Sequence, residues 1–177
     1  MPASTMTGLE HDRERELARE VSGRWGRRAA ITALVAFVAV GLLGGLGYRE
    51  RTARGGNGAV EAVLVYPAVT RGGLPASWSL TIRSRDDDPI GGEVMVATSD
   101  DYFGTFDHND LVPAPDRAWQ TADATRWEYD VDGDAELRIT LDVRTQPDAR
   151  WPRRATTVVE IDGAVVASFH YRTWVLP

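Results

Sequence analysis

The chain contains neither cysteine nor lysine in its 177 residues. The absence of cysteine excludes disulfide bonds, thiolate catalysis and zinc sites with cysteine ligands. It also excludes lipid anchoring through a cysteine side chain. All 20 basic residues are arginines, which we interpret as the coding bias of a GC-rich bacterial genome.

Positive charge is also scarce in the larger part of the chain. Residues 49–177 hold 14 arginines against 21 acidic residues, a net charge of −7, whereas residues 1–48 carry a net charge of +1. A domain this acidic repels the phosphate backbone of nucleic acids. The composition therefore predicts that the protein does not bind nucleic acid.

Charge is absent altogether from the 20 residues between Ala29 and Tyr48, which read AAITALVAFVAVGLLGGLGY. A helix of this length spans about 30 Å, the thickness of the hydrocarbon core of a bilayer. Six arginines precede the run and three follow it closely, which favours a cytoplasmic N-terminus and an extracytoplasmic C-terminal domain. The run predicts a transmembrane helix at residues 29–48 in the bacterial cytoplasmic membrane. A cleaved signal peptide is the alternative, although its apolar core is usually about 7–15 residues long.

Within this run, Gly41 and Gly45 form a GxxxG pair. Such pairs let helix backbones approach closely in lipid, which predicts self-association or a membrane-protein partner. The alternative is that glycine is simply common in membrane helices. Residues 1–28 are expected to form a cytoplasmic head with a short amphipathic helix. Residues 49–58 are expected to form a flexible linker that keeps the following domain near the membrane surface.

Residues 59–177 show strand patterning without a sustained helical period. Apolar residues alternate with polar ones from Trp78 to Ile82 and from Leu137 to Val143. The pair Asp162-Gly163 between two further alternating runs predicts a two-residue hairpin. About seven short strands predict an antiparallel β-sandwich of the immunoglobulin type. A small closed barrel is the alternative.

The segment WSLTIRS at residues 78–84, followed by DDDPIGGEV at residues 86–94, is similar to bacterial surface modules. With the predicted membrane span, the arrangement resembles small bacterial single-pass membrane proteins that carry an Ig-like β-sandwich ectodomain. The resemblance is one of architecture, covers about residues 59–177 and includes no catalytic motif. It implies an adhesive, scaffolding or accessory role.

The segment Ser99–Asp116 is predicted to be a long loop, in which Tyr102, Phe103 and Phe106 stand among acidic residues. Long aromatic loops on a rigid scaffold are frequent binding sites, so these three side chains are candidate interaction residues. The alternative is a loop, or a single helical turn, that packs on itself and covers one end of the sandwich.

A basic and aromatic segment, in contrast to the acidic surroundings, follows later in the chain. Its candidate interaction residues are Arg150, Trp151, Arg153 and Arg154. They are suited to contact the acidic rim of a partner or lipid headgroups. Pairing with the acidic region at residues 86–134 of the same chain is an equally good alternative.

Asp130, Asp132 and Asp134 place carboxylates at every second position, a spacing that can surround Ca²⁺ with oxygen ligands. The glycine stands at the fourth position, not at the sixth as in an EF-hand loop. We therefore favour an ordinary hairpin turn at Asp132-Gly133 and expect no cofactor, with Ca²⁺ as the alternative.

The three histidines are dispersed at positions 11, 108 and 170. His170 shares a strand face with Arg172, which is most simply an exposed face. No nucleophile-elbow, metalloprotease or phosphate-binding motif is present in the sequence. The chain is therefore predicted not to be an enzyme, and a hydrolase built on dispersed carboxylates is the alternative.

Together these features predict a non-enzymatic, membrane-anchored binding or accessory subunit. Its Ig-like domain is expected to act near the membrane surface beside a larger membrane protein. A Ca²⁺-dependent cell-surface adhesin or an envelope scaffold is the alternative function.

Overall fold

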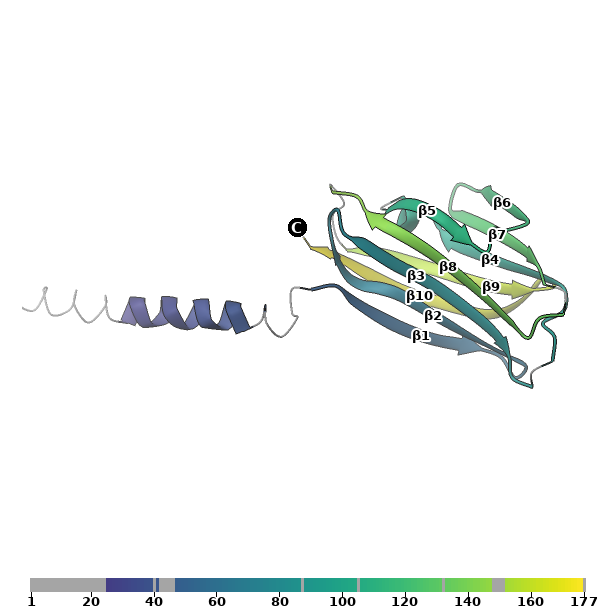
Figure 1. The fold of residues 1–177 in the computed structure, drawn as a ribbon, viewed down its shortest axis with the longest axis horizontal. Coiled ribbons are helices and arrows are strands. Elements are labelled where there is room, and N and C mark those ends of the chain that lie inside the picture. Colours follow the sequence, from purple (N-terminus) through teal and green to yellow (C-terminus); the bar gives the residue numbers. More distant parts are fainter. Residues whose placement is uncertain are drawn as a thin grey trace, which may run out of the picture. The chain divides into compact units, whose positions relative to one another are not determined.

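The computed structural model describes residues 25–39, 41, 47–86, 88–104, 106–131, 133–147 and 152–176, without the side chains of residues 108–110. The chain divides into two compact units, Met1–Leu46 and Gly47–Pro177. Nearly all described residues of the first unit belong to one helix, and the second unit is built mainly of strands (Figure 1).

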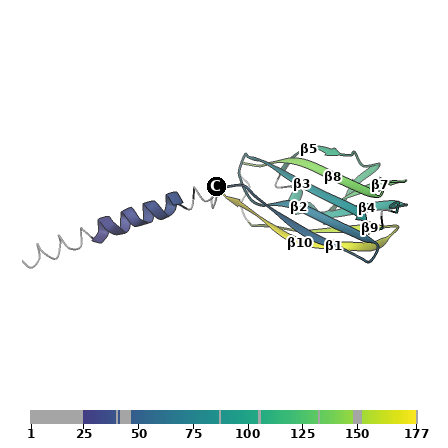
Figure 2. The same cartoon turned by 60° about the horizontal axis from the view of Figure 1, so that its bottom comes forward.

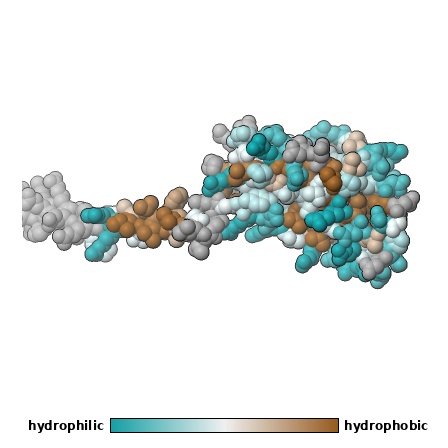
Figure 3. Space-filling model, in the orientation of Figure 1, coloured by the Kyte–Doolittle hydropathy of each residue, from teal (hydrophilic) through white to brown (hydrophobic). Residues whose placement is uncertain are grey.

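The helix of the first unit extends over residues 25–39, and its large apolar side chains are exposed. Figure 3 shows these hydrophobic residues in brown, while hydrophilic residues predominate on the visible face of the second unit. Among the described residues, no helix is long and apolar enough to cross a membrane.

The predicted transmembrane helix at residues 29–48 is therefore wrong, as are the predictions that depended on it. These are the location in the cytoplasmic membrane, the extracytoplasmic placement of the second unit, and a partner bound through a membrane helix. Gly41 is helical and exposed, whereas Gly45 lies outside the described residues.

The second unit contains ten described strands and one short helix. In chain order these are β1 (Arg49–Gly56), β2 (Val60–Arg71), β3 (Pro75–Ser84), β4 (Glu93–Ser99), α2 (Asp100–Phe103), β5 (Phe106–Val112), β6 (Arg117–Gln120), β7 (Ala124–Asp130), β8 (Glu136–Thr145), β9 (Arg153–Ile161) and β10 (Ala164–Leu176). Apart from one short parallel contact between β2 and β10, the described strand pairs are antiparallel.

The strands form one continuous sheet in the order β5-β8-β3-β2-β10-β9-β4-β7-β6, and β1 also pairs with β2. The join between the two halves is the parallel pairing of Val69–Arg71 with Trp174–Leu176. The sheet curls into a half-barrel whose halves face each other (Figures 1 and 2). The predicted seven-stranded Ig-like sandwich is therefore wrong, because β2 hydrogen-bonds to strands of both halves and makes them one sheet.

The flexible linker predicted at residues 49–58 is largely strand β1. Its backbone pairs with β2 from Arg49, opposite Val69, to Gly56, opposite Glu61. A Cβ at Gly55 would lie 3.1 Å from the ring of Phe169, so a glycine lets β1 lie close against β10. The sequence of β1 lacks apolar alternation because most of its side chains are exposed.

The clearest alternating runs of the sequence are strands with one buried face, as predicted. Trp78, Leu80 and Ile82 of β3 are fully buried, and the apolar residues of β8 are buried in the same way. The hairpin between β9 and β10 is also confirmed. Its two central residues, Asp162 and Gly163, have φ values of 50° and 76°, the combination of a type I′ turn.

The inside of the half-barrel combines aromatic rings with hydroxyl groups. Trp78 Nε1 donates a hydrogen bond of 3.1 Å to Tyr171 Oη, which lies 3.0 Å from Thr157 Oγ1. Thr157 Oγ1 in turn lies 2.9 Å from Thr98 Oγ1. Because the hydroxyls satisfy one another, these polar groups are buried without the cost of unpaired donors.

Candidate functional site

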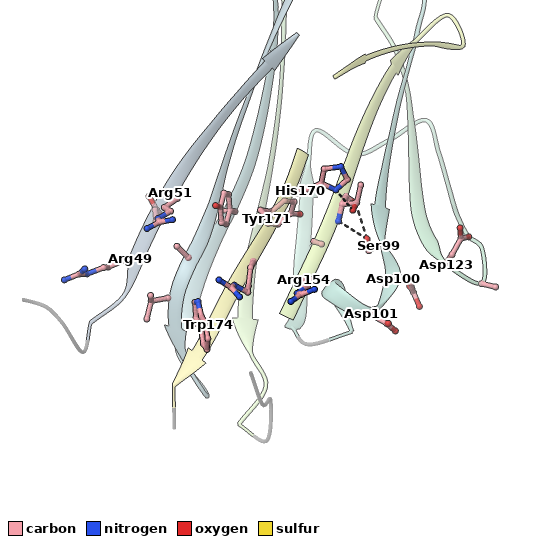
Figure 4. A pocket seen from close by; sticks show the side chains of 18 residues that line it. Arg49, Arg51, Ser99, Asp100, Asp101, Asp123, Arg154, His170, Tyr171 and Trp174 are labelled. Carbon is pink, nitrogen blue, oxygen red and sulfur yellow. Dashed lines mark hydrogen bonds between the residues drawn. The ribbon is translucent and has the colours of Figure 1, made fainter. Parts of the chain in front are cut away.

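A groove of 1190 Å³ lies on the surface of the second unit, where the outer side of β10 meets its neighbours. Residues of β1, β2, β9 and β10, the end of β4, helix α2 and the β6–β7 turn line it (Figure 4). We call it the charged groove and define it by Arg51, Arg154, His170, Arg172, Trp174 and Asp123.

The period of two along β10 places its polar residues in the groove. His170 and Arg172 are exposed, whereas the residue that follows each of them, Tyr171 and Thr173, is buried. The sequence prediction that His170 and Arg172 share an exposed strand face is therefore confirmed.

Register brings two arginines directly opposite each other in the groove. Arg172 of β10 pairs with Arg154 of β9, and both side chains are exposed. In such a pair the Cβ atoms lie about 4.5–5.5 Å apart, and like charges at this position are destabilising. The guanidinium of Arg172 also lies over the ring of Trp174, 4.8 Å from its centroid, as a cation–π contact.

The same groove has acidic residues on its far side. Asp100 and Asp101 come from the short helix α2, and Asp123 from the β6–β7 turn, while Arg49 and Arg51 lie at the opposite side on β1 (Figure 4). Asp123 accepts a hydrogen bond of 2.8 Å from Thr121 Oγ1, which fixes the turn. The groove is therefore polarised, with mainly positive charge over β1, β10 and β9, despite Glu50 on β1, and negative charge beyond β4.

Histidine and threonine connect these two sides. The Nδ1 atom of His170 lies 3.0 Å from Thr156 Oγ1, and the Thr156 backbone N–H donates a 2.9 Å hydrogen bond to Ser99 Oγ. Figure 4 shows these contacts as dashed lines between β10, β9 and β4. The middle of the groove is therefore fixed by hydrogen bonds across three strands.

Beneath the groove lies the buried hydroxyl network. Burial raises the pKa of Tyr171 to about 12, although its hydrogen bonds to Thr157 and Trp78 act in the opposite direction. Burial also raises the pKa of Tyr102 well above its ordinary value, and its hydroxyl lies 2.9 Å from Thr173 Oγ1. These tyrosines stay protonated at neutral pH and form a rigid floor.

The aromatic residues predicted to contact partners are core residues instead. Tyr102, Phe103 and Phe106 are 1%, 2% and 3% exposed, and Tyr102 contacts both phenylalanine rings edge-on. The predicted loop Ser99–Asp116 contains α2, β5 and the end of β4, and the three rings point into the half-barrel from α2 and β5. The alternative of a self-packed loop does not describe this segment either, because β5 pairs with β8 and Phe103 contacts Trp78 and Trp127 outside the segment.

The basic segment reaches the groove only in part. Arg154 lines the charged groove, whereas Arg153 is half-buried, and its Nε has no hydrogen-bond partner among the described residues. Arg150 and Trp151 lie outside the described residues.

The acidic segment between β7 and β8 is a connection between the two halves of the sheet. The hairpin predicted at Asp132-Gly133 is wrong, because β7 pairs with β4 and β6, whereas β8 pairs with β3 and β5. Asp130 and Asp134 are exposed, and Asp132 is outside the described residues. The described part of the chain contains no group of three or more histidine or acidic side chains arranged to hold a metal ion.

Sequence reasoning missed Arg51 and Trp174 as members of the site, and it did not connect Arg154 with Arg172. The alternation of β10 indicates which residues share a face, but register decides which residue of β9 lies opposite. That register follows from the two-residue turn at Asp162-Gly163 together with a shift between Val165 and Ala167, and the shift has no sequence signal.

No known protein family matches the chain, and no curated protein sequence matches it either. Among solved structures, it is similar to the alkylpurine DNA glycosylase AlkC of Pseudomonas fluorescens bound to DNA with an abasic site analogue. The TM-score is 0.31 at 15% identity, over 72% of this chain and 31% of the glycosylase chain. It is also similar to AvmM, which catalyses macrocyclization in alchivemycin A biosynthesis, with a TM-score of 0.36 at 16% identity, over 73% of this chain and 96% of AvmM.

Both neighbours are enzymes, and one of them is bound to DNA. The predictions that the chain is not an enzyme and that it binds no nucleic acid find no support in these neighbours, and we drop them. Both TM-scores lie below 0.5, so the likeness assigns no activity, substrate or partner to this chain.

Proposed function

We propose that the second unit is a binding module whose charged groove holds an acidic segment of a partner protein. The observation that carries this proposal is the opposed pair Arg154 and Arg172. Two like charges facing each other across a strand pair cost stability, and an anion between them removes that cost.

Two arginine side chains of the groove are available for such an anion. Neither the side chain of Arg51 nor that of Arg154 makes a hydrogen bond or ion pair with any described residue. The ion pairs Arg83–Glu136 and Arg117–Glu128 both lie outside the groove. Planar guanidinium groups match carboxylate geometry in two parallel hydrogen bonds, so an opposed pair suits glutamate and aspartate side chains.

The size and lining of the groove favour a polypeptide over a small molecule. Its volume of 1190 Å³ exceeds the roughly 300–1,000 Å³ of pockets that enclose small ligands. Val69, Tyr66 and Trp174 add apolar contact area beside the arginines. A chain segment that carries both carboxylates and apolar side chains matches this combination.

The proposal is tested with the full-length chain and a fluorescein-labelled hexaglutamate peptide, by fluorescence anisotropy at low and high salt. We expect binding that weakens with salt, and an affinity up to about fivefold lower in Arg172→Gln, because an exposed ion pair contributes about 0.2–1 kcal/mol. Arg138→Gln is the matched control, since Arg138 is an exposed arginine of β8 outside the groove.

Two results contradict the proposal. One is hexaglutamate binding that is absent, or equally weakened by the Arg138 control. The other is an oligothymidylate of equal charge that binds more tightly than the peptide and loses affinity in Arg172→Gln, which assigns the groove to nucleic acid instead.

A further inference from the structure

We infer that the charged groove selects a bipolar segment, in which acidic residues are followed, about four residues away, by basic residues. This inference rests on the proposed function and adds the second half of the recognition. In the bound complex, the acidic residues of the ligand lie over the arginines of β10 and β9. The basic residues of the ligand lie against the groove's carboxylates beyond β4.

The acidic side of the groove comes from two separate elements. Asp100 and Asp101 occupy the first turn of α2, and Asp123 stands in the turn before β7. Asp100 Oδ1 accepts a hydrogen bond of 3.1 Å from Thr125 Oγ1, and Asp123 Oδ1 accepts one of 2.8 Å from Thr121 Oγ1. The side chains of Asp101 and Asp123 are exposed to a ligand in the groove. A ligand with carboxylates along its whole length meets repulsion here, and a ligand that ends in cations meets attraction.

The order of the strands sets the distance between the two sides. From Arg172 on β10 the sheet continues through β9 and β4 to β7, next to Asp123. Three inter-strand spacings of about 4.8 Å give roughly 14 Å, which an extended peptide covers in about four residues. The ligand therefore crosses the strands, and it carries its two charged groups at that separation.

The floor between the two sides is suited to an uncharged spacer. Tyr171 and Ala155 are buried, and Thr156 Oγ1 lies within hydrogen-bond distance of His170 Nδ1. A short spacer of small residues passes over this part without leaving a charge unpaired.

Two peptides of identical composition and zero net charge test the inference with the full-length chain. One is Glu-Glu-Gly-Ser-Gly-Arg-Arg, with segregated charges, and the other is Glu-Arg-Gly-Ser-Gly-Glu-Arg, with mixed charges. We expect the segregated peptide to bind at least about fivefold more tightly than the mixed one, in competition with labelled hexaglutamate.

A double substitution separates this inference from the proposed function. In Asp101→Asn with Asp123→Asn, we expect the segregated peptide to lose most of its advantage and hexaglutamate to bind more tightly, because repulsion is removed. Asp86→Asn, an exposed acidic residue outside the groove, is the control and is expected to change neither affinity.

The outcomes are distinguishable. If hexaglutamate binds through Arg172 but the two peptides compete equally, the inference is wrong and the proposed function stands. If neither hexaglutamate nor the segregated peptide binds, both the proposed function and the inference are wrong. A segregated peptide whose advantage survives the double substitution also overturns the inference.

Discussion

The two faces of strand β10 handle polar groups in opposite ways. On the inner face, Tyr171 and Thr173 are buried, and each hydroxyl has a partner within the chain. On the outer face, Arg172 is exposed and stands opposite another arginine. Adjacent residues of one strand therefore differ completely in whether their polar groups are satisfied.

This difference separates residues that stabilise the fold from residues that are available to a ligand. A buried polar group without a partner costs about 1–3 kcal/mol of stability. Substitutions on the inner face that leave such a group unpaired are therefore destabilising. An exposed guanidinium stays hydrated and costs little, so the outer face can keep charges that no described residue neutralises. The following predictions test the contrast, beginning with the largest expected effect.

Removal of an inner ring is expected to destabilise the second unit strongly. Phe103→Ala deletes a side chain that is 2% exposed and packs against the rings of Trp78 and Trp127, with centroids 5.8 and 5.3 Å away. We expect a loss of about 3–5 kcal/mol in the free energy of unfolding by urea. Trp119→Ala, at the exposed edge strand β6, is the control, with an expected loss of about 1 kcal/mol or less. Comparable losses for the two variants would contradict the assignment of Phe103 to the core.

On strand β10, alkaline pH is expected to act through Tyr171 of the inner face. The pKa of Tyr171 is 10.0 in the unfolded chain and about 12 in the fold, so above pH 10 the unfolded state releases its proton first. The contribution of Tyr171 is complete below pH 10 and is lost as the pH rises through 12, by about 2–3 kcal/mol. The chain has no cysteine or lysine, so tyrosines are its only side chains with ordinary pKa values between about 8 and 11.

Urea unfolding at pH 8, 10 and 11 measures this dependence. Tyr171→Phe is the comparison, and its free energy of unfolding is expected to fall less steeply above pH 10, although it is lower at pH 8. Equal slopes for the two proteins would show that Tyr171 is not buried as described.

On the outer face, removal of a charge is expected to stabilise the protein slightly. Arg154→Gln relieves the repulsion with Arg172, so we expect a gain of about 0.2–1 kcal/mol at low salt. The gain is expected to shrink at high salt, where exposed charges are screened. Arg138 faces Thr81, not another charge, across its strand pair, so Arg138→Gln is expected to give no gain in stability. Destabilisation by Arg154→Gln, or an effect independent of salt, would mean that Arg154 has a partner in the free protein.

The sequence allowed the prediction of those strands that bury one face and of the turn that connects the last two. Trp78 to Ile82 and Leu137 to Val143 alternate because one side of each strand lies in the core. Strand β1 was not predictable in this way, because it is held by backbone pairing to β2 and leaves its arginines exposed. The aromatic residues of α2 were misjudged because acidic neighbours gave the segment the composition of a surface loop.

The site itself depends on pairings that no local pattern records. Arg51 of β1 is far in the chain from Arg154 and Arg172, which belong to the β9–β10 hairpin, and the curl of the sheet brings all three to one groove. Only the shared face of His170 and Arg172 follows from the spacing within one strand.

The parallel join between β2 and β10 also determines when the second unit can finish folding during synthesis. Thr173 Oγ1 donates a hydrogen bond to the carbonyl oxygen of Pro67, 106 residues earlier in the chain. During synthesis, the end of β2 must therefore wait for almost the whole unit to leave the ribosome before it gains its neighbour. Contacts so distant in sequence slow folding and leave strand edges exposed meanwhile. Because β10 carries Arg172 and is the last described strand of the unit, we expect the groove to be the last part of the unit to form.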